Sequence, residues 1–440
     1  MSRVVVLHPD LGIGGAERLI VDAAMALIQH KHQVEVYTGY HDRSRCFDET
    51  RDGRLNVTVI GRRIPRSIFG RFIALLAYIK MIYIAIYIIV FTKNKYDFVL
   101  CDQVSACIPI FKILQLFKKQ LKIVFYCHFP DQLLTTRESL LKAIYRKPID
   151  FFEEWSTSLA DKIVVNSKFT SNMVKQTFRS LRNRNLIVLY PCVDVTGFSM
   201  RKKLASLSAC SLPVQECIGK VINVTGSYLF LSLNRFERKK DIRLAIESLQ
   251  KLQLKLDRAL DGSKKPINPK QIFLVVAGGY DDRLPECIEY YRELADMVSR
   301  NKNLVGQVIF IKSPHEIDKL ILLRSCDAVV YTPENEHFGI VPLEAMAMSK
   351  PVIASRSGGP LETIVDTGTS ATGLLCDHNS ESFAVAMLSL CQNKEQSQEM
   401  GSNGFERVKS HFSKKSFGEQ IDRIFGGQTE ETNLFRSWAD

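Results

Sequence analysis

The sequence predicts an α/β protein built from two doubly wound parallel sheets, each in its own domain. Its 440 residues exceed what one ordinary hydrophobic core accommodates, so two domains of about 200 residues are expected. Short apolar strands alternate with helical stretches in the first half, and the same alternation restarts after residue 227. This pattern is typical of parallel sheets, whose ligands bind at the carboxyl ends of the strands and, here, between two such domains.

The first domain is expected at residues 1–200. Its first strand precedes a helix at Ala16–His30, and residues 201–227 lack clear periodicity, which predicts a linker. The predicted strands are Val4–His8, Gln33–Thr38, Val57–Ile60, Phe98–Cys101, Ile123–Cys127, Ile163–Asn166 and Leu186–Leu189.

The second domain is expected at residues 228–410, with a surface loop at 257–270. Amphipathic helices over 406–425 lead into a helical tail, residues 411–440. The predicted strands are Leu229–Leu233, Phe273–Ala277, Val308–Ile311, Ala328–Tyr331 and Val352–Ala354.

One helix, within residues 68–92, is apolar enough to meet a membrane. Phe72 to Val90 is interrupted only by Lys80, and about 20 apolar residues can span a bilayer. A span would separate Val4–Leu7 from Phe98–Leu100, two strands of one predicted sheet. A helix lying in the membrane interface avoids this conflict, and a buried core helix also remains open. The basic residues that flank the segment are Arg62, Arg63, Arg66, Arg71, Lys93 and Lys95.

The composition limits which binding partners and which cellular compartment are expected. A net charge of +12 fits phosphate-bearing substrates or anionic lipid, and no zinc-finger spacing or RNA-binding signature is present, so no nucleic acid partner is expected. The 11 cysteines include no CxxC pair, which indicates reduced thiols in the cytosol. No cleavable signal peptide is expected, because Val4–Leu7 is too short an apolar stretch.

The strongest candidate site contains two glutamates, Glu336 and Glu344. Glu336 is expected in a glycine-bearing loop after strand Ala328–Tyr331, and Glu344 in the first turn of a helix that starts near Pro342. Backbone N–H groups of such a loop and the helix dipole favour an anion. Both carboxylates can then reach one ligand, which points to an enzyme that handles a nucleotide-activated group.

Glycines and basic residues follow other strands. Gly14 and Gly15 come between the first strand and its helix, where a diphosphate can approach the backbone closely, although a plain tight turn is the alternative. Arg235 and Lys240 follow Leu229–Leu233 and are credible phosphate contacts, whereas a solvated charged face is the alternative. His128 ends another strand on the expected ligand side, and a structural role remains open for it.

Together these residues resemble the retaining glycosyltransferases of family 4, which have two Rossmann-like domains facing a central cleft (GT-B) and a Glu-x₇-Glu signature. A narrower likeness is to eukaryotic α1,3/α1,6-mannosyltransferases of the dolichol pathway. One departure is Asp241, at a position where relatives often have Gly. The stretches that carry these likenesses are Gly14–Glu17, Cys127–Asp131, Tyr145–Asp150, Asn234–Lys240, Ala277–Gly279, Glu336–Gly339 and Gly358–Pro360.

The resemblance implies mannose transfer from GDP-mannose to a dolichol-diphosphate-linked oligosaccharide at the membrane surface, on the cytosolic face of the endoplasmic reticulum. It further implies retention of configuration, no metal or other cofactor, and a possible complex with other early-pathway glycosyltransferases. Glu336 would hold the donor mannose, Glu344 the ribose and His128 a mannose hydroxyl. The other residues implied at the donor site are Gly14, Gly15, Arg235, Lys239, Lys240, Gly279, His337, Phe338, Gly339 and Ile340.

Two other interpretations fit the same residues. A related transferase could use a UDP-sugar and another lipid acceptor such as phosphatidylinositol, which competition between GDP and UDP distinguishes. A non-catalytic scaffold that binds nucleotide sugars is the alternative from another class of protein. A complete set of Glu336, Glu344, Arg235 and Lys240 argues against the scaffold.

Overall fold

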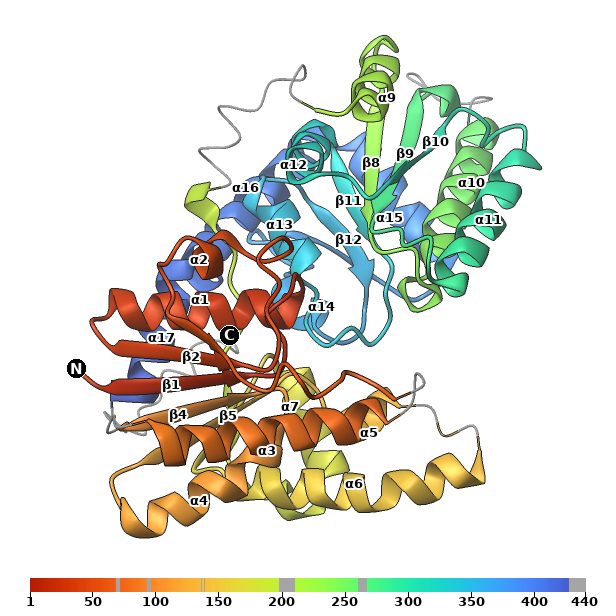
Figure 1. Ribbon diagram of the computed structural model, residues 1–440. Coiled ribbons are helices and arrows are strands. Elements are labelled where there is room, and N and C mark those ends of the chain that lie inside the picture. The colour runs from red at the N-terminus through yellow and green to blue at the C-terminus, as the bar shows by residue number, and fades with distance from the viewer. Residues whose placement is uncertain are drawn as a thin grey trace. The chain divides into compact units, whose positions relative to one another are not determined.

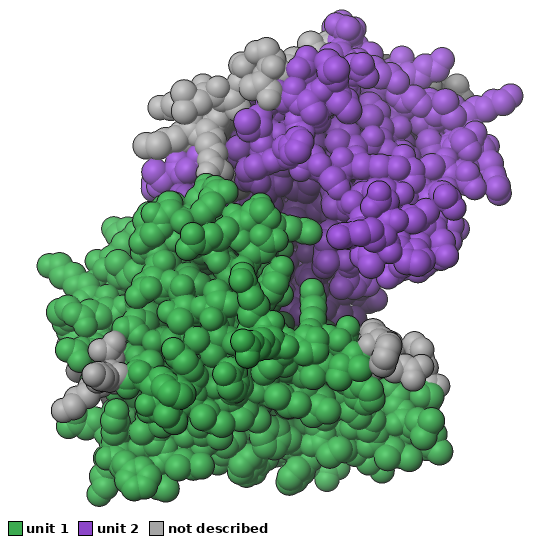
Figure 2. All heavy atoms as spheres, viewed as in Figure 1, with its two compact units in different colours: residues 1–192, 414–440 green, residues 193–413 purple. Residues whose placement is uncertain are grey.

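The computed structural model describes residues 1–68, 72–92, 96–135, 137, 139–197, 210–259 and 267–426. The chain divides into a first unit, residues 1–192 with 414–440, and a second unit, residues 193–413 (Figure 2). Parts of several sequence predictions lie outside the described residues, namely Arg71, Lys93, Lys95, residues 201–209 of the expected linker, residues 260–266 of the expected loop and residues 427–440 of the expected tail.

The first unit contains a seven-stranded sheet of order β3-β2-β1-β4-β5-β6-β7, in which every pairing is parallel. Every strand predicted for this half is present, within two residues of its expected bounds. The strands are β1 (Arg3–His8), β2 (Gln33–Thr38), β3 (Val57–Val59), β4 (Phe98–Asp102), β5 (Lys122–Cys127), β6 (Lys162–Val165) and β7 (Ile187–Val188).

Helices cover both faces of this sheet (Figure 1). α1 and α17 share one apolar core with the sheet, and α3 and α4 share another on the opposite face. The C-terminal helix α17 therefore belongs to the first unit, because its Phe417 and Ile421 are buried against α1. The helices are α1 (Gly15–Gln29), α2 (Asp48–Arg51), α3 (Ile73–Phe91), α4 (Ile108–Phe117), α5 (Asp131–Leu134), α6 (Leu140–Ser158), α7 (Lys168–Thr177) and α17 (Lys414–Gly426).

The apolar helix α3 uses one face to cover the sheet. Met81, Ile84 and Ala85 are each fully buried in the core. The opposite face leaves Ile79 and Tyr83 45% and 48% exposed. By length and composition α3 is also long and apolar enough to cross a membrane. One apolar face of α3 is therefore used to cover the sheet, and the other apolar face is exposed, where lipid could contact it.

The second unit contains a six-stranded parallel sheet of order β10-β9-β8-β11-β12-β13. The five predicted strands are present, and β13 is an addition. β13 has only four residues and begins with Gly373, so its sequence has no alternating pattern by which a strand could be predicted. The Gly373 backbone lies against that of Val352 in β12. The strands are β8 (Tyr228–Leu233), β9 (Ile272–Gly278), β10 (Val308–Lys312), β11 (Ala328–Tyr331), β12 (Val352–Ser355) and β13 (Gly373–Cys376).

Helices also pack on both faces of this sheet. α10, α11 and α15 contribute to its main core. α9 lies within the stretch expected as linker, so residues 212–222 form a helix of the second unit. The helices are α9 (Leu212–Ile222), α10 (Ile242–Ala259), α11 (Pro285–Ser299), α12 (Glu316–Ser325), α13 (Ile340–Ala347), α14 (Pro360–Thr363), α15 (Ser380–Gln392) and α16 (Lys394–His411). Each of the 11 cysteines is a free thiol.

Candidate active site

Glycines from two loops, one before α13 and one after β12, shape the segment that contains Glu336. Gly339 caps α13 at φ +82° and lies against the ring of Tyr331, where a Cβ would be 3.1 Å from the ring. Gly358 adopts φ +61°, and a Cβ there would run into the backbone of Glu336. The Gly359 N–H also donates to the Glu336 carbonyl at 2.8 Å. Because no side chain intervenes, the Glu336 segment is held in place by its backbone.

Glu336 forms an ion pair with Lys240. The two side chains are only 22% and 13% exposed. Burial alone would raise the pKa of Glu336, but the bonded ammonium brings that pKa below its ordinary value. Lys240 follows β8 and Glu336 follows β11, which pair in the sheet, so the two loops are neighbours although the residues are far apart in sequence. Thr332 strengthens the junction by donating to the Lys240 carbonyl at 2.7 Å.

Glu344 has a different cationic partner. Lys319 of α12 donates to its carboxylate at 2.8 Å, and the Glu344 side chain is 14% exposed. Burial would lower the pKa of Lys319, but the carboxylates of Glu344 and Glu316 raise it. The prediction that Glu344 lies in the first helical turn was wrong: α13 begins at Ile340, so Glu344 is its fifth residue. The helix starts two residues earlier than expected because Gly339, at its N-cap, makes the bend before Ile340.

The remaining basic residues after β8 are more exposed. Arg235 and Lys239 both contact Glu237, at 2.6 and 3.2 Å, and their side chains are 62% and 68% exposed. Gly279 lies beside the Arg235 side chain, and its carbonyl accepts from the Phe236 N–H at 3.0 Å, which joins the loops after β8 and β9. Lys240 is thus the member of this basic run that contacts Glu336.

The backbone explains the departure at Asp241. This residue adopts a left-handed conformation, φ +42°, which glycine accepts most readily and which aspartate tolerates better than most side chains. Its carboxylate contacts His378 Nε2 at 3.0 Å, and His378 Nδ1 contacts Ser355 Oγ at 3.0 Å. The aspartate is therefore anchored to the end of β12, and this contact holds the turn that follows Lys240.

Phe338 and Ile340, two other residues predicted at the donor site, differ from each other in exposure. Phe338 is 5% exposed and its ring lies 6.2 Å from that of Phe412, so it is a core side chain of the second unit. Ile340 is 37% exposed at the start of α13.

In the part of the chain that the structure describes, no group of three or more His, Cys, Asp or Glu side chains is arranged to hold a metal ion.

In the first unit, His128 belongs to a buried polar group that the sequence analysis missed. Its Nε2 contacts Asp102 at 3.0 and 3.3 Å, and Asp102 is fully buried. His8 Nδ1 lies 3.4 Å from the same carboxylate, and burial lowers the pKa of His8 to about 4, so His8 is neutral at physiological pH. His8, Asp102 and His128 end or follow β1, β4 and β5, and the carboxyl ends of these neighbouring strands were the available signal.

Gly14 and Gly15 stand at the start of α1. The Gly14 carbonyl accepts the first helical N–H bond, from Arg18 at 2.9 Å, and no side chain caps this helix terminus. The Glu17 carboxylate lies against Gly14, and burial raises the pKa of Glu17. These glycines and His128 are in the first unit, whereas Arg235, Lys240, Glu336 and Glu344 are in the second.

Of the three stretches that carry the narrower resemblance, Cys127–Asp131 and Tyr145–Asp150 meet within the first unit, and Glu237–Lys240 belongs to the second. Arg146 of α6, with a side chain 3% exposed, bonds Asp131 at 2.8 Å and Asp150 at 2.8 Å. Glu153 accepts from the backbone N–H of Asp131 at 2.7 Å, and burial raises the pKa of Glu153 to about 8. The segment that follows His128 is therefore attached to α6 by buried polar contacts.

Known glycosyltransferase families match both units of the chain. The family model described as Glycosyltransferase Family 4 matches residues 13–196, and the model described as Glycosyl transferases group 1 matches residues 216–407. Alpha-1,3/1,6-mannosyltransferase ALG2 of Dictyostelium discoideum is 43% identical, over 96% of this chain and 97% of its own. The protein of that name in Homo sapiens is 43% identical, over 96% and 94%, and that of Saccharomyces cerevisiae is 39% identical, over 96% and 84%.

Solved structures support the fold. Sucrose-phosphate synthase from Thermosynechococcus elongatus matches 97% of this chain and 98% of its own with a TM-score of 0.67 and 18% identity. Anabaena Alr3699/HepE, in complex with UDP and glucose, matches 97% and 100% with a TM-score of 0.64 and 18% identity. At such identities the likeness concerns the fold alone, and it confirms the predicted GT-B architecture.

Proposed function

The chain belongs to the α1,3/1,6-mannosyltransferase family of glycosyltransferases, and from this premise we propose that it transfers mannose from GDP-mannose to a dolichol-diphosphate-linked oligosaccharide. Membership makes it a mannosyltransferase of lipid-linked oligosaccharide synthesis and implies a nucleotide-sugar donor and a lipid-linked acceptor. The acceptor we propose carries one mannose on chitobiose and receives an α1,3- and then an α1,6-linked mannose.

The observation that carries the proposed chemistry is the Lys240–Glu336 ion pair at the carboxyl ends of β8 and β11. Breaking a sugar–diphosphate bond places negative charge on the leaving phosphate, which fixed cations stabilise in the transition state. We assign Lys240 and Arg235 to that diphosphate. Lys240 also offsets the charge of Glu336, so an anionic donor can approach this carboxylate without strong repulsion.

The carboxylates are assigned to the two sugars of the donor. Glu336 holds the mannose and stabilises positive charge that develops at its reacting carbon, and Glu344 in α13 holds the ribose hydroxyls. His128 of the first unit contacts a mannose hydroxyl, and Asp102 orients its ring. Retention follows from attack on the face that the diphosphate leaves, with the leaving phosphate accepting the proton of the acceptor hydroxyl.

Location follows in part from the family. Membership implies a membrane-associated enzyme of the endoplasmic reticulum, and we propose that both units face the cytosol. The free cysteines support this orientation, and the exposed apolar face of α3 supports association with the membrane. We further propose assembly with other early glycosyltransferases of the pathway, which co-purification from detergent-solubilised membranes tests.

The decisive experiment is mannose transfer from GDP-mannose to a short-chain lipid diphosphate carrying the mannosylated chitobiose core, with products resolved by mass. Gain of one and then two hexoses is expected, together with inhibition by GDP and not by UDP. The Glu336→Gln variant should bind GDP and transfer nothing. Transfer unchanged in that variant would refute the assignment of Glu336, and transfer from a UDP-sugar instead would refute the donor.

A further inference from the structure

The one charged residue of the apolar helix α3, Lys80, points into the first unit and away from the exposed apolar face. It lies on the buried side of α3 with Leu76 and Ile84, one turn away in either direction, and is 9% exposed. The Lys80 stem passes against Gly39, which follows β2, where any Cβ would run into its methylenes. Gly61, which follows β3, also lies along the stem, and a Cβ added there would be 3.5 Å from Lys80 Cγ.

This path brings the ammonium group to the carboxyl edge of the sheet. Asp10 follows β1 at the same edge, and its carboxylate is near enough for each of the two groups to affect the pKa of the other. Even so, Lys80 has no hydrogen-bond or ion-pair partner within the described ranges. Arg66 adds a second positive charge nearby, and Glu17 is close enough to Asp10 for that carboxylate to affect the pKa of Glu17.

Lys80 is buried as a whole residue, mostly through its apolar stem, and burial lowers its pKa because the charged form loses part of its hydration. Its ammonium group, which bonds no carboxylate of the described residues, can therefore bond an anionic ligand. The lysine also lies at the carboxyl ends of parallel strands, where ligands of this fold class bind. Lys80 and Arg66 supply two positive charges at this edge, and an ammonium is a common phosphate contact.

We propose that Lys80, with Arg66, binds a phosphate or diphosphate ester at the carboxyl edge of β1, β2 and β3. The proposal rests on the proposed function in assigning this ester to the diphosphate of the lipid-linked acceptor. The position fits that assignment: β2 and β5, which His128 follows, are three strand spacings apart, or about 14 Å. A chain of three sugar rings spans a comparable length, so the reacting mannose can reach His128 while the diphosphate stays at Lys80.

The position of Lys80 also explains why a charge is tolerated in this helix. The exposed face of α3 remains apolar for contact with lipid, whereas Lys80 extends from the opposite face to the sheet edge. A lipid-linked diphosphate has the same two-part chemistry, with an apolar tail next to a charged group. A phospholipid headgroup shares the phosphate, so the experiment must separate these two sources.

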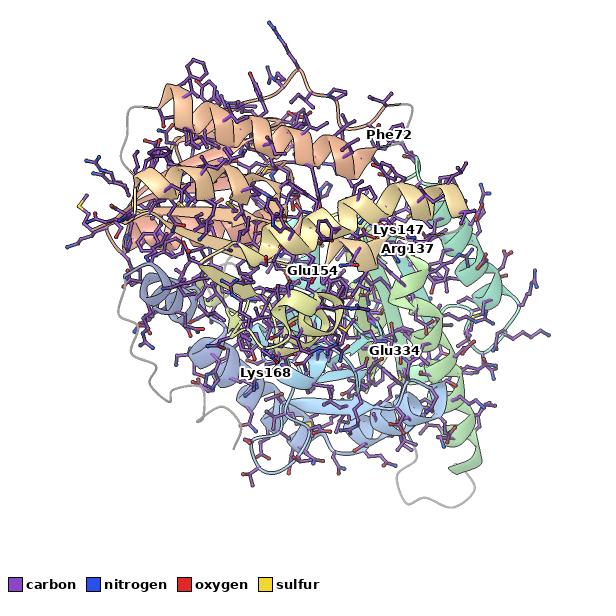
Figure 3. All side chains as sticks on the ribbon, turned by 90° about the horizontal axis from the view of Figure 1, so that it is seen from below. Phe72, Arg137, Lys147, Glu154, Lys168 and Glu334 are labelled. Carbon is purple, nitrogen blue, oxygen red and sulfur yellow. The ribbon has the colours of Figure 1, made fainter. Side chains whose placement is uncertain are left out.

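The test compares Lys80→Met, which keeps the length of the side chain and removes its charge, with Lys80→Arg, which restores the charge. The control is Lys147→Met, which removes an exposed lysine from α6 of the same unit (Figure 3). Lys80→Met should raise the acceptor KM about ten- to hundredfold, the effect of losing one charge-assisted hydrogen bond, with GDP affinity unchanged. Lys80→Arg should recover much of the loss, and Lys147→Met should show none.

Direct binding separates the two phosphate sources. Lys80→Met should lose affinity for farnesyl diphosphate and keep its binding to vesicles with or without anionic phospholipid. Loss of binding to anionic vesicles alone, with an unchanged acceptor KM, would assign the site to a headgroup and overturn the acceptor assignment. Unchanged values in every assay, or equal losses in Lys147→Met, would overturn the site itself.

Two measurements keep these outcomes interpretable. Arg66→Gln changes an exposed residue and should raise the acceptor KM several-fold, so the proposal remains testable if Lys80→Met does not fold. If the wild-type protein transfers no mannose, the proposed function fails, yet farnesyl diphosphate binding still decides the role of Lys80. If the wild type transfers mannose and Lys80→Met behaves identically, only the inference about Lys80 fails.

Discussion

Replacing Lys240 by methionine tests the centre of the proposed site. The substitution keeps the apolar stem and removes the charge that pairs with Glu336, whose side chain is 22% exposed. Removing one partner of a fully buried ion pair costs about 3–5 kcal/mol, whereas exposed pairs contribute at most about 1 kcal/mol. Because this pair is largely but not fully buried, we expect a loss of about 2 kcal/mol in the free energy of unfolding.

The effect on catalysis should be larger than the effect on folding. Loss of one group that stabilises transition-state charge lowers turnover by about 10²–10³-fold. The control is Lys239→Met, because Lys239 is 68% exposed and contacts Glu237 instead. Mannose transfer by both variants, measured at saturating acceptor, should separate them by at least about tenfold. Equal losses in the two variants, or full turnover in Lys240→Met, would refute the assignment of Lys240 to the leaving diphosphate.

The same pair predicts a pH dependence of stability. Burial would raise the pKa of Glu336 above its ordinary value of 4.5, but Lys240 brings it below that value in the folded protein. The stabilisation is therefore present above pH 4.5 and is lost as the pH falls through the lowered pKa. Urea unfolding of wild type and Lys240→Met should show a difference in stability that shrinks below about pH 4. A difference that grows on acidification would contradict the predicted sign.

Three further substitutions test the surroundings of the site. Asp102→Asn should lower turnover about tenfold or more and leave GDP affinity unchanged, because His128 loses the carboxylate that orients it. Arg146→Met should cost about 3 kcal/mol of unfolding free energy in urea, since two carboxylates lose their buried partner. Gly358→Ala should lower the melting temperature and the affinity for GDP together, because its Cβ would push the Glu336 backbone. An unchanged variant in any of these assays contradicts the corresponding contact.

Much of the fold could be predicted because its signals are local. The strands are short apolar runs, and parallel sheets bury them on both faces, so they are visible without knowledge of their neighbours. The spacing of Glu336 and Glu344 likewise belongs to one loop and one helix. The local signal failed at β13, where four residues beginning with glycine carry no pattern, and at the start of α13, which Gly339 sets two residues earlier than expected.

Side-chain partnerships required the tertiary structure. The sequence alone determined two α/β units, their strands, an apolar helix and the residue types that face a ligand edge. Only the structure placed Lys240 on Glu336, Asp102 beside His128 and Lys80 at the sheet edge. The physical reason is that each contact joins segments far apart in the chain, and strand order decides which of them meet. Strand order depends on how whole helices and sheets pack, which no local pattern of residues encodes.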